Sequence, residues 1–339
     1  REKSMEQGKK VIFSGIQPTG KITIGNYLGS LKNWIGMQEE FDCIFCVVDM
    51  HSITVTQVPS ELRKNTFDLL ALYMACGLSP EKSILFVQSH VPAHAELTWV
   101  LNTIAYVGEM NRMTQFKDKS RKHADNINMG LMDYPVLMAS DILLYQADLV
   151  PVGVDQKQHV ELARNLAQRF NSRYSPTFVV PDCYIPPVAA KITSLQDPTA
   201  KMSKSDPNEN AVVTMFDDKD AITRKFKRAV TDSDTEIRFD REKKPGVSNL
   251  LSIYCGFTGV TEKAAEEEFA GKGYGELKAR VAESVIAALE PIQREQKRLA
   301  ADKAYLEAVL KTGAEKAERI ANRTLEKVYR KVGFIPRAR

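Results

Sequence analysis

Residues 11–26 decide the fold and read V-I-F-S-G-I-Q-P-T-G-K-I-T-I-G-N. The apolar run at 11–13 is typical of a buried strand, and from Asn26 onward apolar residues recur at helical spacing. Glycine and proline interrupt the stretch between them, at Gly15, Pro18, Gly20 and Gly25. A strand, a glycine-rich turn and a helix can turn backbone N–H groups toward a phosphate. The spacing matches neither a Walker loop nor G-x-G-x-x-G, and alone it fits a simple strand-to-helix connection equally well.

Apolar runs alternate with helical patterns as far as residue 180, which predicts an α/β fold with a doubly wound parallel sheet of Rossmann type. Strands are predicted at 11–14, 43–48, 84–88, 149–152 and 177–180. Helices are predicted between them at 26–38, 60–76, 94–106, 134–146 and 155–170. From residue 216 the pattern is helical only, at 217–229, 247–257, 261–269, 274–299, 302–310 and 313–331. We therefore expect a nucleotide-binding domain over residues 9–215 and a helical C-terminal domain over residues 216–339.

Polar clusters follow three of the predicted strands, at 14–17, 49–51 and 153–156. Open parallel sheets bind their ligands at the carboxyl ends of the strands. We expect these three clusters to lie at one rim.

A second stretch, K-M-S-K-S at 201–205, lies between Asp-Pro turn signals. Two flexible ammonium groups and two hydroxyls suit a triphosphate whose charge shifts during a reaction. Taken alone, such a pentamer is most often a solvated basic loop.

Together the two stretches resemble the signatures of class I aminoacyl-tRNA synthetases, and the T-I-G-N form of the first points to the tryptophanyl subfamily. Thr23 and Asn26 stand where many members of the wider class have the outer histidines of their H-I-G-H signature. Further blocks similar to that subfamily are M-T-Q-F-K-D-K-S at 113–120, D-I-L-L-Y at 141–145, V-P-V-G-V-D-Q-K-Q-H at 150–159 and A-V-T-D-S at 229–233. The resemblance covers nearly the whole chain.

The resemblance implies that both stretches and the loop after the fourth strand bind ATP. The implied residues are Gln17, Pro18, Thr19, Gly25, Asn26, Gly153, Val154, Asp155, Ile192, Lys201, Met202, Ser203, Lys204 and Ser205. Val154 replaces an acidic residue that the family often has, but its neighbours remain. Catalytic roles are implied for Lys119, Lys201, Ser203 and Lys204, which would stabilise charge on the phosphates.

Tyr134, Met138, Asp141 and Tyr145 fall on one face of the helix predicted at 134–146. The pattern alone fits an aspartate at the surface or paired within the core. The resemblance instead implies that Asp141 accepts a hydrogen bond from the indole N–H of tryptophan. The other tryptophan-binding residues that it implies are Phe13, His51, Tyr134, Met138, Val150, Val152 and Gln156.

The activity implied by the resemblance has two steps. The carboxylate of L-tryptophan attacks the α-phosphate of ATP, giving tryptophanyl-adenylate and pyrophosphate, and the terminal adenosine of tRNA(Trp) then accepts the tryptophan. Mg²⁺ would bridge phosphate oxygens, and no metal site of the protein itself is expected. The family is typically homodimeric.

Composition fits this class: 43% of residues are hydrophobic and 27% charged, as in ordinary globular proteins. No apolar run reaches the roughly 18 residues of a membrane span, and the first residues lack a signal-peptide core. We therefore expect a cytoplasmic protein that does not engage the membrane. We also expect Met5 to be its natural start. The five cysteines are an odd number, and Cys43-x-x-Cys46 lies in a predicted strand without a second close pair, so we expect core cysteines. Residues 216–339 hold 26 Lys and Arg against 21 Asp and Glu, an excess that suits either an RNA contact or ordinary surface helices.

Three other functions stay open. A tyrosyl-tRNA synthetase would share the fold, although its second signature is typically K-F-G-K-S rather than K-M-S-K-S. Another nucleotidyltransferase with a related first signature would usually lack the long helical region. A non-catalytic RNA-binding relative would have lost Lys201 and Lys204 or the turn at Gly25, all of which are intact.

Overall fold

The computed structural model describes residues 8–113, 127–153, 156–185, 192–204 and 206–335. The chain forms two compact units. Unit 1 comprises Arg1–Thr19, Gly36–Ile185 and Asp302–Arg339, and unit 2 comprises Gly20–Ile35 and Pro186–Ala301. Within the described ranges, no helix is both long enough and apolar enough to cross a membrane.

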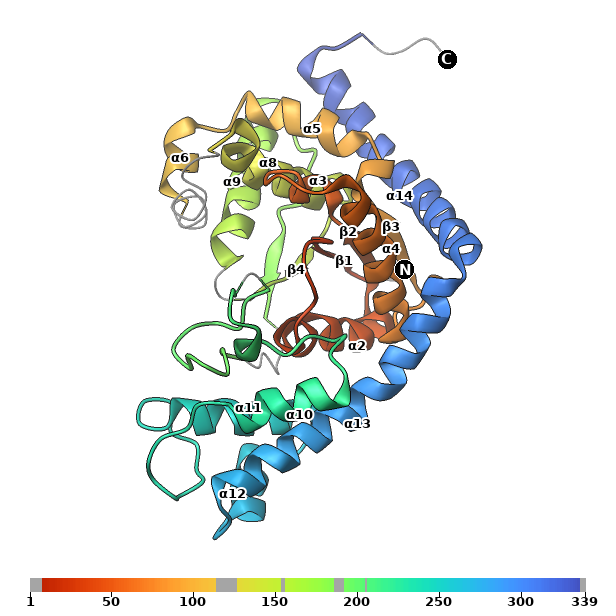
Figure 1. Cartoon of the computed structure of the whole chain (residues 1–339). Helices are drawn as coiled ribbons and strands as arrows, with labels where there is room; N and C mark the ends of the chain where they lie inside the picture. Colours follow the sequence, from red (N-terminus) through yellow and green to blue (C-terminus); the bar gives the residue numbers. More distant parts are fainter. Residues whose placement is uncertain (1–7, 114–126, 154–155, 186–191, 205, 336–339) are drawn as a thin grey trace, which may run out of the picture. The chain divides into compact units, whose positions relative to one another are not determined.

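Unit 1 is built on a five-stranded sheet in which every strand runs parallel to its neighbours, in the order β3-β2-β1-β4-β5 (Figure 1). The strands are β1 (Val11–Ile16), β2 (Asp42–Val47), β3 (Ser83–Val87), β4 (Leu149–Pro151) and β5 (Asp182–Tyr184). In register, Ile12 of β1 lies between Cys43 of β2 and Leu149 of β4. The strand order reverses between β1 and β4, the position at which open α/β sheets bind ligands. The predicted doubly wound parallel sheet is confirmed.

The last strand lies later in the chain than predicted, because 177–180 is not a strand. The side chain of Asn171 takes the backbone donors of this segment: its Oδ1 accepts from the N–H of Thr177 at 2.8 Å and of Phe178 at 2.9 Å. Backbone donors that are bonded to a side chain cannot join a strand ladder. The pairing strand therefore forms at β5 instead.

Helices flank the sheet of unit 1. They are α2 (Lys32–Glu40, within which the boundary between the units falls), α3 (Asp49–Ser52), α4 (Pro59–Ala75), the 3₁₀ turn η2 (Gln88–His90), α5 (Ala93–Asn102), α6 (Val107–Arg112), α8 (Met129–Leu144), α9 (Lys157–Arg173) and α14 (Lys303–Val332). Helix α8 begins earlier than predicted, because the Asn128 side chain caps it by accepting from the N–H of Leu131 at 2.9 Å. Pro135 consequently lies inside the helix rather than in its first turn.

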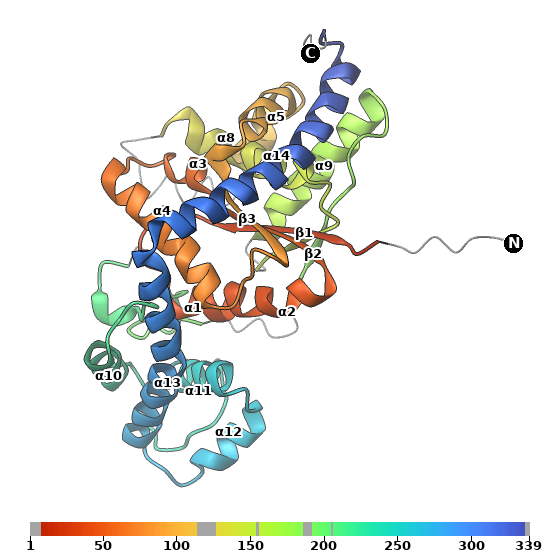
Figure 2. The same ribbon diagram turned by 90° about the vertical axis from the view of Figure 1, so that its right-hand side faces the viewer.

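Helix α14 packs against β3, α5 and α8 and so belongs to unit 1 (Figure 2). A single helix replaces the two predicted at 302–310 and 313–331, and Gly313 lies in its interior. A Cβ atom at Gly313 would lie 1.8 Å from the carbonyl oxygen of Leu85 in β3. The glycine is therefore a close-packing position and not a helix break.

The hydrophobic core of unit 1 joins the strands to α5, α8, α9 and α14. Cys43 and Cys46 are buried and free, as expected for core residues. Burial raises the pKa of the Cys43 thiol to about 12 and that of Cys46 well above its ordinary value. A buried thiol with a raised pKa is a poor metal ligand and a poor redox nucleophile.

Unit 2 is helical. Its elements are α1 (Ile24–Asn26), the π-helical turn η1 (Tyr27–Leu31), the 3₁₀ turn η5 (Glu209–Ala211), α10 (Lys219–Lys227), α11 (Pro245–Thr258), α12 (Glu262–Phe269) and α13 (Tyr274–Ala301). Helix α13 packs against α10 and α11, and α12 packs against α11. The compact units do not follow the predicted boundary near residue 215. The N–H of Val230 donates to the carbonyl of Leu195 at 2.8 Å, and this backbone hydrogen bond ties the two sides of that boundary into unit 2.

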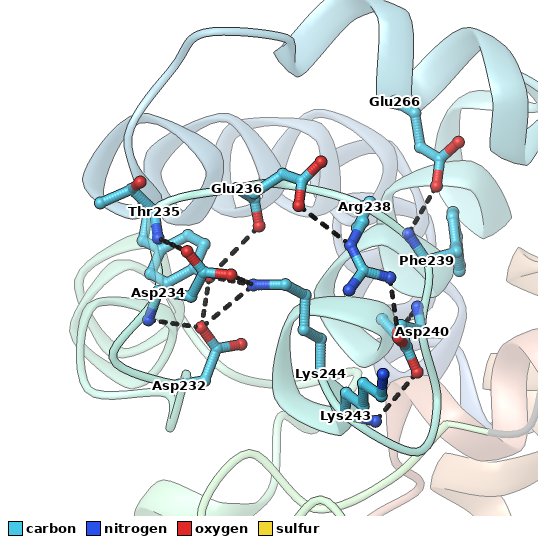
Figure 3. A network of polar contacts seen from close by, with 12 residues as sticks. Asp232, Asp234, Thr235, Glu236, Arg238, Phe239, Asp240, Lys243, Lys244 and Glu266 are labelled. Atoms are coloured by element: carbon cyan, nitrogen blue, oxygen red, sulfur yellow. Dashed lines mark hydrogen bonds and ion pairs between the residues drawn. The ribbon is translucent and has the colours of Figure 1, made fainter.

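The loop between α10 and α11 is held by a polar network around Lys244, shown in Figure 3. The Lys244 ammonium, whose side chain is 3% exposed, lies 2.8 Å from Asp234, 3.3 Å from Asp232 and 3.1 Å from the Tyr274 hydroxyl. The loop contains the A-V-T-D-S block, so the network gives Asp232 of that block a structural role.

Candidate functional site

The predicted polar cluster at 14–17 lies at the carboxyl end of β1, the cluster at 49–51 follows β2, and Gly153 and Gln156 of the third cluster follow β4. Because these strands are parallel, the described residues of the three clusters lie at the carboxyl edge of the sheet. Gln17, Pro18 and Thr19 directly follow β1, and Gly153 follows β4, on the two sides of the strand-order reversal. Gln156 is the exposed N-cap residue of α9. Val154 and Asp155 lie outside the described residues.

A carboxylate is buried beside this edge. Asp141 of α8 is 1% exposed, and three protein side chains donate hydrogen bonds to it. Its Oδ1 accepts from Nε2 of Gln88 at 2.7 Å and from Nδ1 of His94 at 2.6 Å, and its Oδ2 accepts from Nε2 of His51 at 2.7 Å. Burial alone would raise the pKa of Asp141, but the charge and hydrogen bond of His51 and the hydrogen bond of His94 lower it below its usual range. The carboxylate is therefore ionised in the core.

Sequence reasoning placed Asp141 and His51 near each other only as members of one predicted pocket, and it missed Gln88 and His94. Both missed side chains are completely buried. They follow β3, one in η2 and the other in α5. The rule that singled out the polar residues after β1, β2 and β4 applies equally to the polar run 88–90, at the end of the strand predicted at 84–88. It would have found Gln88 but not His94, which starts the helix predicted at 94–106.

Apolar and aromatic side chains that were predicted to bind tryptophan lie in the hydrophobic core of unit 1 or against it. Phe13, Val150 and Val152 belong to the core of unit 1, and Met138 packs against it. The ring of Phe13 stacks on Tyr145 with centroids 5.4 Å apart and planes 5° apart. The structure thus brings four of the predicted tryptophan-binding residues into one cluster.

Tyr134 also faces this region. Its ring lies edge-on to that of His51 at 6.3 Å, and its hydroxyl is 3.0 Å from Nε2 of His159. Burial raises the pKa of the Tyr134 hydroxyl, so it stays protonated at neutral pH. It can act there as a hydrogen-bond donor.

In unit 2 the T-I-G-N residues start a helix. The Thr23 hydroxyl accepts from the N–H of Asn26 at 3.1 Å, and the Asn26 side chain accepts from the N–H of Thr23 at 3.1 Å. This reciprocal capping box fixes the start of α1. Thr23 and Asn26 therefore have a structural role in addition to any contact with a ligand.

The same unit brings the two signature stretches together. A Cβ atom at Gly25 would lie 3.5 Å from Cβ of Ile192 and 3.7 Å from Cβ of Met202. Met202 is 3% exposed, and its N–H donates to the carbonyl of Ile192 at 3.2 Å. The buried methionine anchors the K-M-S-K-S loop beside the glycine of T-I-G-N.

The lysines of this loop differ in environment. Lys201 is exposed, whereas Lys204 is half-buried and lies beside Gly20, whose Cβ would be 3.5 Å from Cβ of Lys204. Loss of hydration lowers the pKa of Lys204 to about 8. Ser203 is half-buried, and Ser205 and Lys119 lie outside the described residues. A poorly hydrated ammonium is a strong attractor for a phosphate, since less water must be removed on binding.

The predicted ATP-binding residues are distributed over both units. Gln17, Pro18, Thr19 and Gly153 belong to unit 1; Gly25, Asn26, Ile192 and residues 201–204 belong to unit 2. Chemically, unit 1 offers a buried acceptor within an aromatic cluster, and unit 2 offers paired lysines and hydroxyls beside a helix start.

The family model described as tRNA synthetases class I (W and Y) matches residues 5–290. A protein named tryptophan–tRNA ligase from Clostridium tetani is 56% identical over 332 residues, which cover 98% of this chain and 98% of that protein. A protein of the same name from Clostridium acetobutylicum is 54% identical over 98% of this chain and 99% of that protein. Among solved structures, tryptophanyl-tRNA synthetase from Mycoplasma pneumoniae aligns with a TM-score of 0.91 and 37% identity over 96% of this chain and 98% of its own. The Campylobacter jejuni enzyme complexed with ADP and tryptophan aligns with a TM-score of 0.81 and 32% identity over 96% of this chain and 100% of its own.

Proposed function

This chain belongs to the class I tRNA synthetases of the tryptophan and tyrosine group, and from that premise we propose that it is the ligase that joins L-tryptophan to tRNA(Trp). It uses ATP to form tryptophanyl-adenylate and pyrophosphate, and then transfers tryptophan to the 3′-terminal adenosine. The observation that carries this proposal is identity of 53–56% over nearly the full length of tryptophan–tRNA ligases. Two tyrosyl-tRNA synthetases of solved structure, from Aeropyrum pernix and Archaeoglobus fulgidus, align at 20% and 19% identity, which supports the fold alone.

In the first step the carboxylate of tryptophan is already a nucleophile, so positioning and charge stabilisation carry the rate. Lys201, Lys204 and Ser203 bind the β- and γ-phosphates as negative charge moves onto pyrophosphate, and Lys119 assists them. The contact between Gly20 and Lys204 supports this assignment, because it puts a lysine of the second signature beside the glycine-rich turn of the first.

The adenosine part of ATP is bound by the residues after β1 and β4, together with the start of α1. Gln17, Pro18, Thr19 and Gly153 have the position after the strands that favours a nucleotide, and Gly25 lets a ligand approach the backbone closely. Ile192 and Met202 pack beneath Gly25, which supports their inclusion in the site. Asn26, Val154, Asp155 and Ser205 complete the proposed set.

Tryptophan binds in the cluster around Asp141. A carboxylate has about four acceptor positions, and donors from the described part of the chain occupy three of them, two on Oδ1 and one on Oδ2. The indole N–H donates to Oδ2. Phe13, Tyr134, Met138, Val150 and Val152 contact the ring, and His51 and Gln156 lie toward the amino and carboxylate groups.

Three further components belong to the proposal. Mg²⁺ enters with ATP, bound by phosphate oxygens, since Mg²⁺ retains several waters and binds largely through substrate phosphates. The helical region 216–339 contacts the anticodon part of tRNA(Trp), with its excess of basic residues as support. The active form is a homodimer, which sedimentation equilibrium of the purified chain would test.

The proposal is tested by ATP–pyrophosphate exchange with tryptophan, tyrosine and phenylalanine. We expect exchange with tryptophan only, and a fall of about tenfold to a hundredfold in kcat/KM for tryptophan in Asp141→Asn, which keeps the shape of the side chain but removes the charge. Asp133→Asn is the matched control on the same helix, because within the described ranges that carboxylate accepts a hydrogen bond from Asn102 and none from the residues around Asp141. Exchange with tyrosine in place of tryptophan would overturn the substrate, and exchange with none of the three would overturn the activity.

A further inference from the structure

The buried carboxylate of Asp141 is held from one side by two residues that have no assigned role. Gln88 and His94 come from segments after β3, are completely buried, and both donate to Oδ1. An oxygen of a carboxylate has two acceptor positions, so these two donors saturate Oδ1. Oδ2 keeps acceptor capacity, because among the residues that the structure describes it accepts from His51 alone.

His94 is itself fixed through its other ring nitrogen. Nε2 lies 2.8 Å from the Tyr145 hydroxyl, and the two rings have their centroids 5.5 Å apart. A neutral imidazole with its proton on Nδ1 satisfies both contacts: it donates to Asp141 and accepts from Tyr145. The arrangement is a chain of hydrogen bonds from Tyr145 through His94 to the carboxylate.

The backbone of His94 is anchored as well. Its carbonyl accepts from the hydroxyl of Thr98 at 2.7 Å and from the hydroxyl of Ser140 at 2.8 Å. Ser140 precedes Asp141 in α8, so the histidine and the carboxylate are fixed to the same two helices, α5 and α8. The anchored backbone fixes the point from which the side chain projects, and turning the imidazole away from Oδ1 would break both of its ring hydrogen bonds, to Asp141 and to Tyr145.

We propose that His94, supported by Gln88, is a positioning residue for substrate selectivity, which saturates Oδ1 and holds the carboxylate so that Oδ2 is presented to an N–H donor of the aromatic substrate. This inference rests on the proposed function, since it takes tryptophan as that substrate. His94 does not touch the substrate in this scheme and acts through Asp141. With Oδ1 left unsaturated, the carboxylate turns or accepts water there, and the preference for an N–H donor falls.

The competing explanation is that His94 only satisfies a buried charge. Activity alone cannot separate the two, because both predict a weaker enzyme. Selectivity does, if tryptophan is compared with benzothienylalanine, the analogue in which sulfur replaces the indole N–H. A loss of stability lowers activity with both amino acids alike, whereas a misplaced carboxylate lowers activity only with the one that carries an N–H.

The experiment measures kcat and KM in ATP–pyrophosphate exchange for both amino acids, in the full-length wild type and in variants. We expect the wild type to prefer tryptophan by about tenfold to a hundredfold in kcat/KM, the effect of one hydrogen bond to a charged group. His94→Leu should lose most of this preference through KM for tryptophan, with KM for ATP within about twofold of wild type. His94→Asn should restore most of it, because the Asn amide nitrogen can replace Nδ1 as the donor.

Two further variants keep the test decisive. Tyr145→Phe removes only the hydroxyl that is hydrogen-bonded to Nε2 of His94. It should give a preference for tryptophan between those of the wild type and His94→Leu, and it can be measured even if His94→Leu fails to fold. Gln38→Leu is the control for lost buried hydrogen bonds, since Gln38 is 6% exposed and bonds residues 77, 79 and 83 at the other end of β3. It should lower stability with the preference unchanged.

An unchanged preference for tryptophan over benzothienylalanine in His94→Leu would overturn the inference. If His94→Leu does not fold, an unchanged preference in Tyr145→Phe would overturn it. In either case, activation of tryptophan by the wild type would still uphold the proposed function. An equal loss of preference in Gln38→Leu would overturn it too. Failure of the wild type to activate tryptophan would instead overturn the proposed function itself, and this inference with it.

Discussion

Raising the pH above 8 should weaken ATP binding through Lys204. Loss of hydration lowers the pKa of its ammonium to about 8 from the ordinary 10.5. A phosphate binds the ammonium form, so the fraction of competent protein falls as the pH passes 8. At pH 7 about nine-tenths of the side chains are charged and at pH 9 about one-tenth, so the apparent Kd for ATP should rise about tenfold between these values.

Two variants isolate this lysine. Lys204→Arg stays charged throughout the range and should give a nearly flat pH profile, whatever its affinity. Lys201→Arg alters an exposed lysine of the same loop and should keep the wild-type slope. The assay is calorimetric titration with a non-hydrolysable ATP analogue and Mg²⁺, at constant ionic strength from pH 7 to 9. Equal slopes in the wild type and in Lys204→Arg would refute the reasoning.

The titration of Lys204 does not itself destabilise the folded chain, because it shifts stability in the direction opposite to its effect on ATP binding. The folded pKa of Lys204 is below the unfolded value, so the unfolded chain binds more protons between about pH 8 and 10.5. The contribution of this group to the free energy of unfolding therefore rises with pH over that window. Weaker ATP binding together with undiminished stability is the expected signature.

Two further predictions concern the frame of the site. Gly313→Ala puts a methyl group against the backbone of β3 and should lower the free energy of unfolding by about 1–3 kcal/mol, measured by urea unfolding. Gly36→Ala is the control inside α2, where open space surrounds the added methyl group, and should raise the free energy of unfolding by about 0.5–1 kcal/mol. Equal effects of the two substitutions would contradict the close packing of α14. Lys244→Met removes the cation from the network of Figure 3 and should lower the thermal unfolding midpoint. Lys243→Met alters an exposed neighbour and should lower the midpoint less. Indistinguishable midpoints would show that the network contributes little to stability.

The sheet was predictable from sequence because its strands are short apolar runs separated by helical patterns. The start of α8 and the position of β5 were not predictable, because both depend on hydrogen bonds from side chains to the backbone. Asn128 caps the helix and Asn171 takes two backbone donors through side-chain hydrogen bonds, which hydrophobic periodicity does not register. A local propensity rule assigns such asparagines to loops and misses what they do to the next element.

The division into compact units was beyond sequence reasoning because it depends on packing between distant segments. Helix α14 carries the same amphipathic signal as α10 or α13, and nothing in its own residues says which partner it takes. Gly313 is the exception, since a glycine inside a long helical pattern indicates either a break or a close approach. The structure shows the close approach, against Leu85.

The site was predicted in part, and the missing part changes the argument about selectivity. The sequence pattern left Asp141 either at the surface or paired within the core, and the resemblance gave it the indole N–H of tryptophan as a partner. Gln88, His94 and His51 already stabilise it, although the first two lie 53 and 47 residues away in the chain. A phenylalanine in this pocket would therefore leave a carboxylate that still has three donors, and not an unpaired charge. The discrimination that Asp141 supplies is then that of one hydrogen bond to a charged group, about tenfold to a hundredfold, and any larger rejection of phenylalanine must come from the fit of the indole ring against Phe13 and its apolar neighbours.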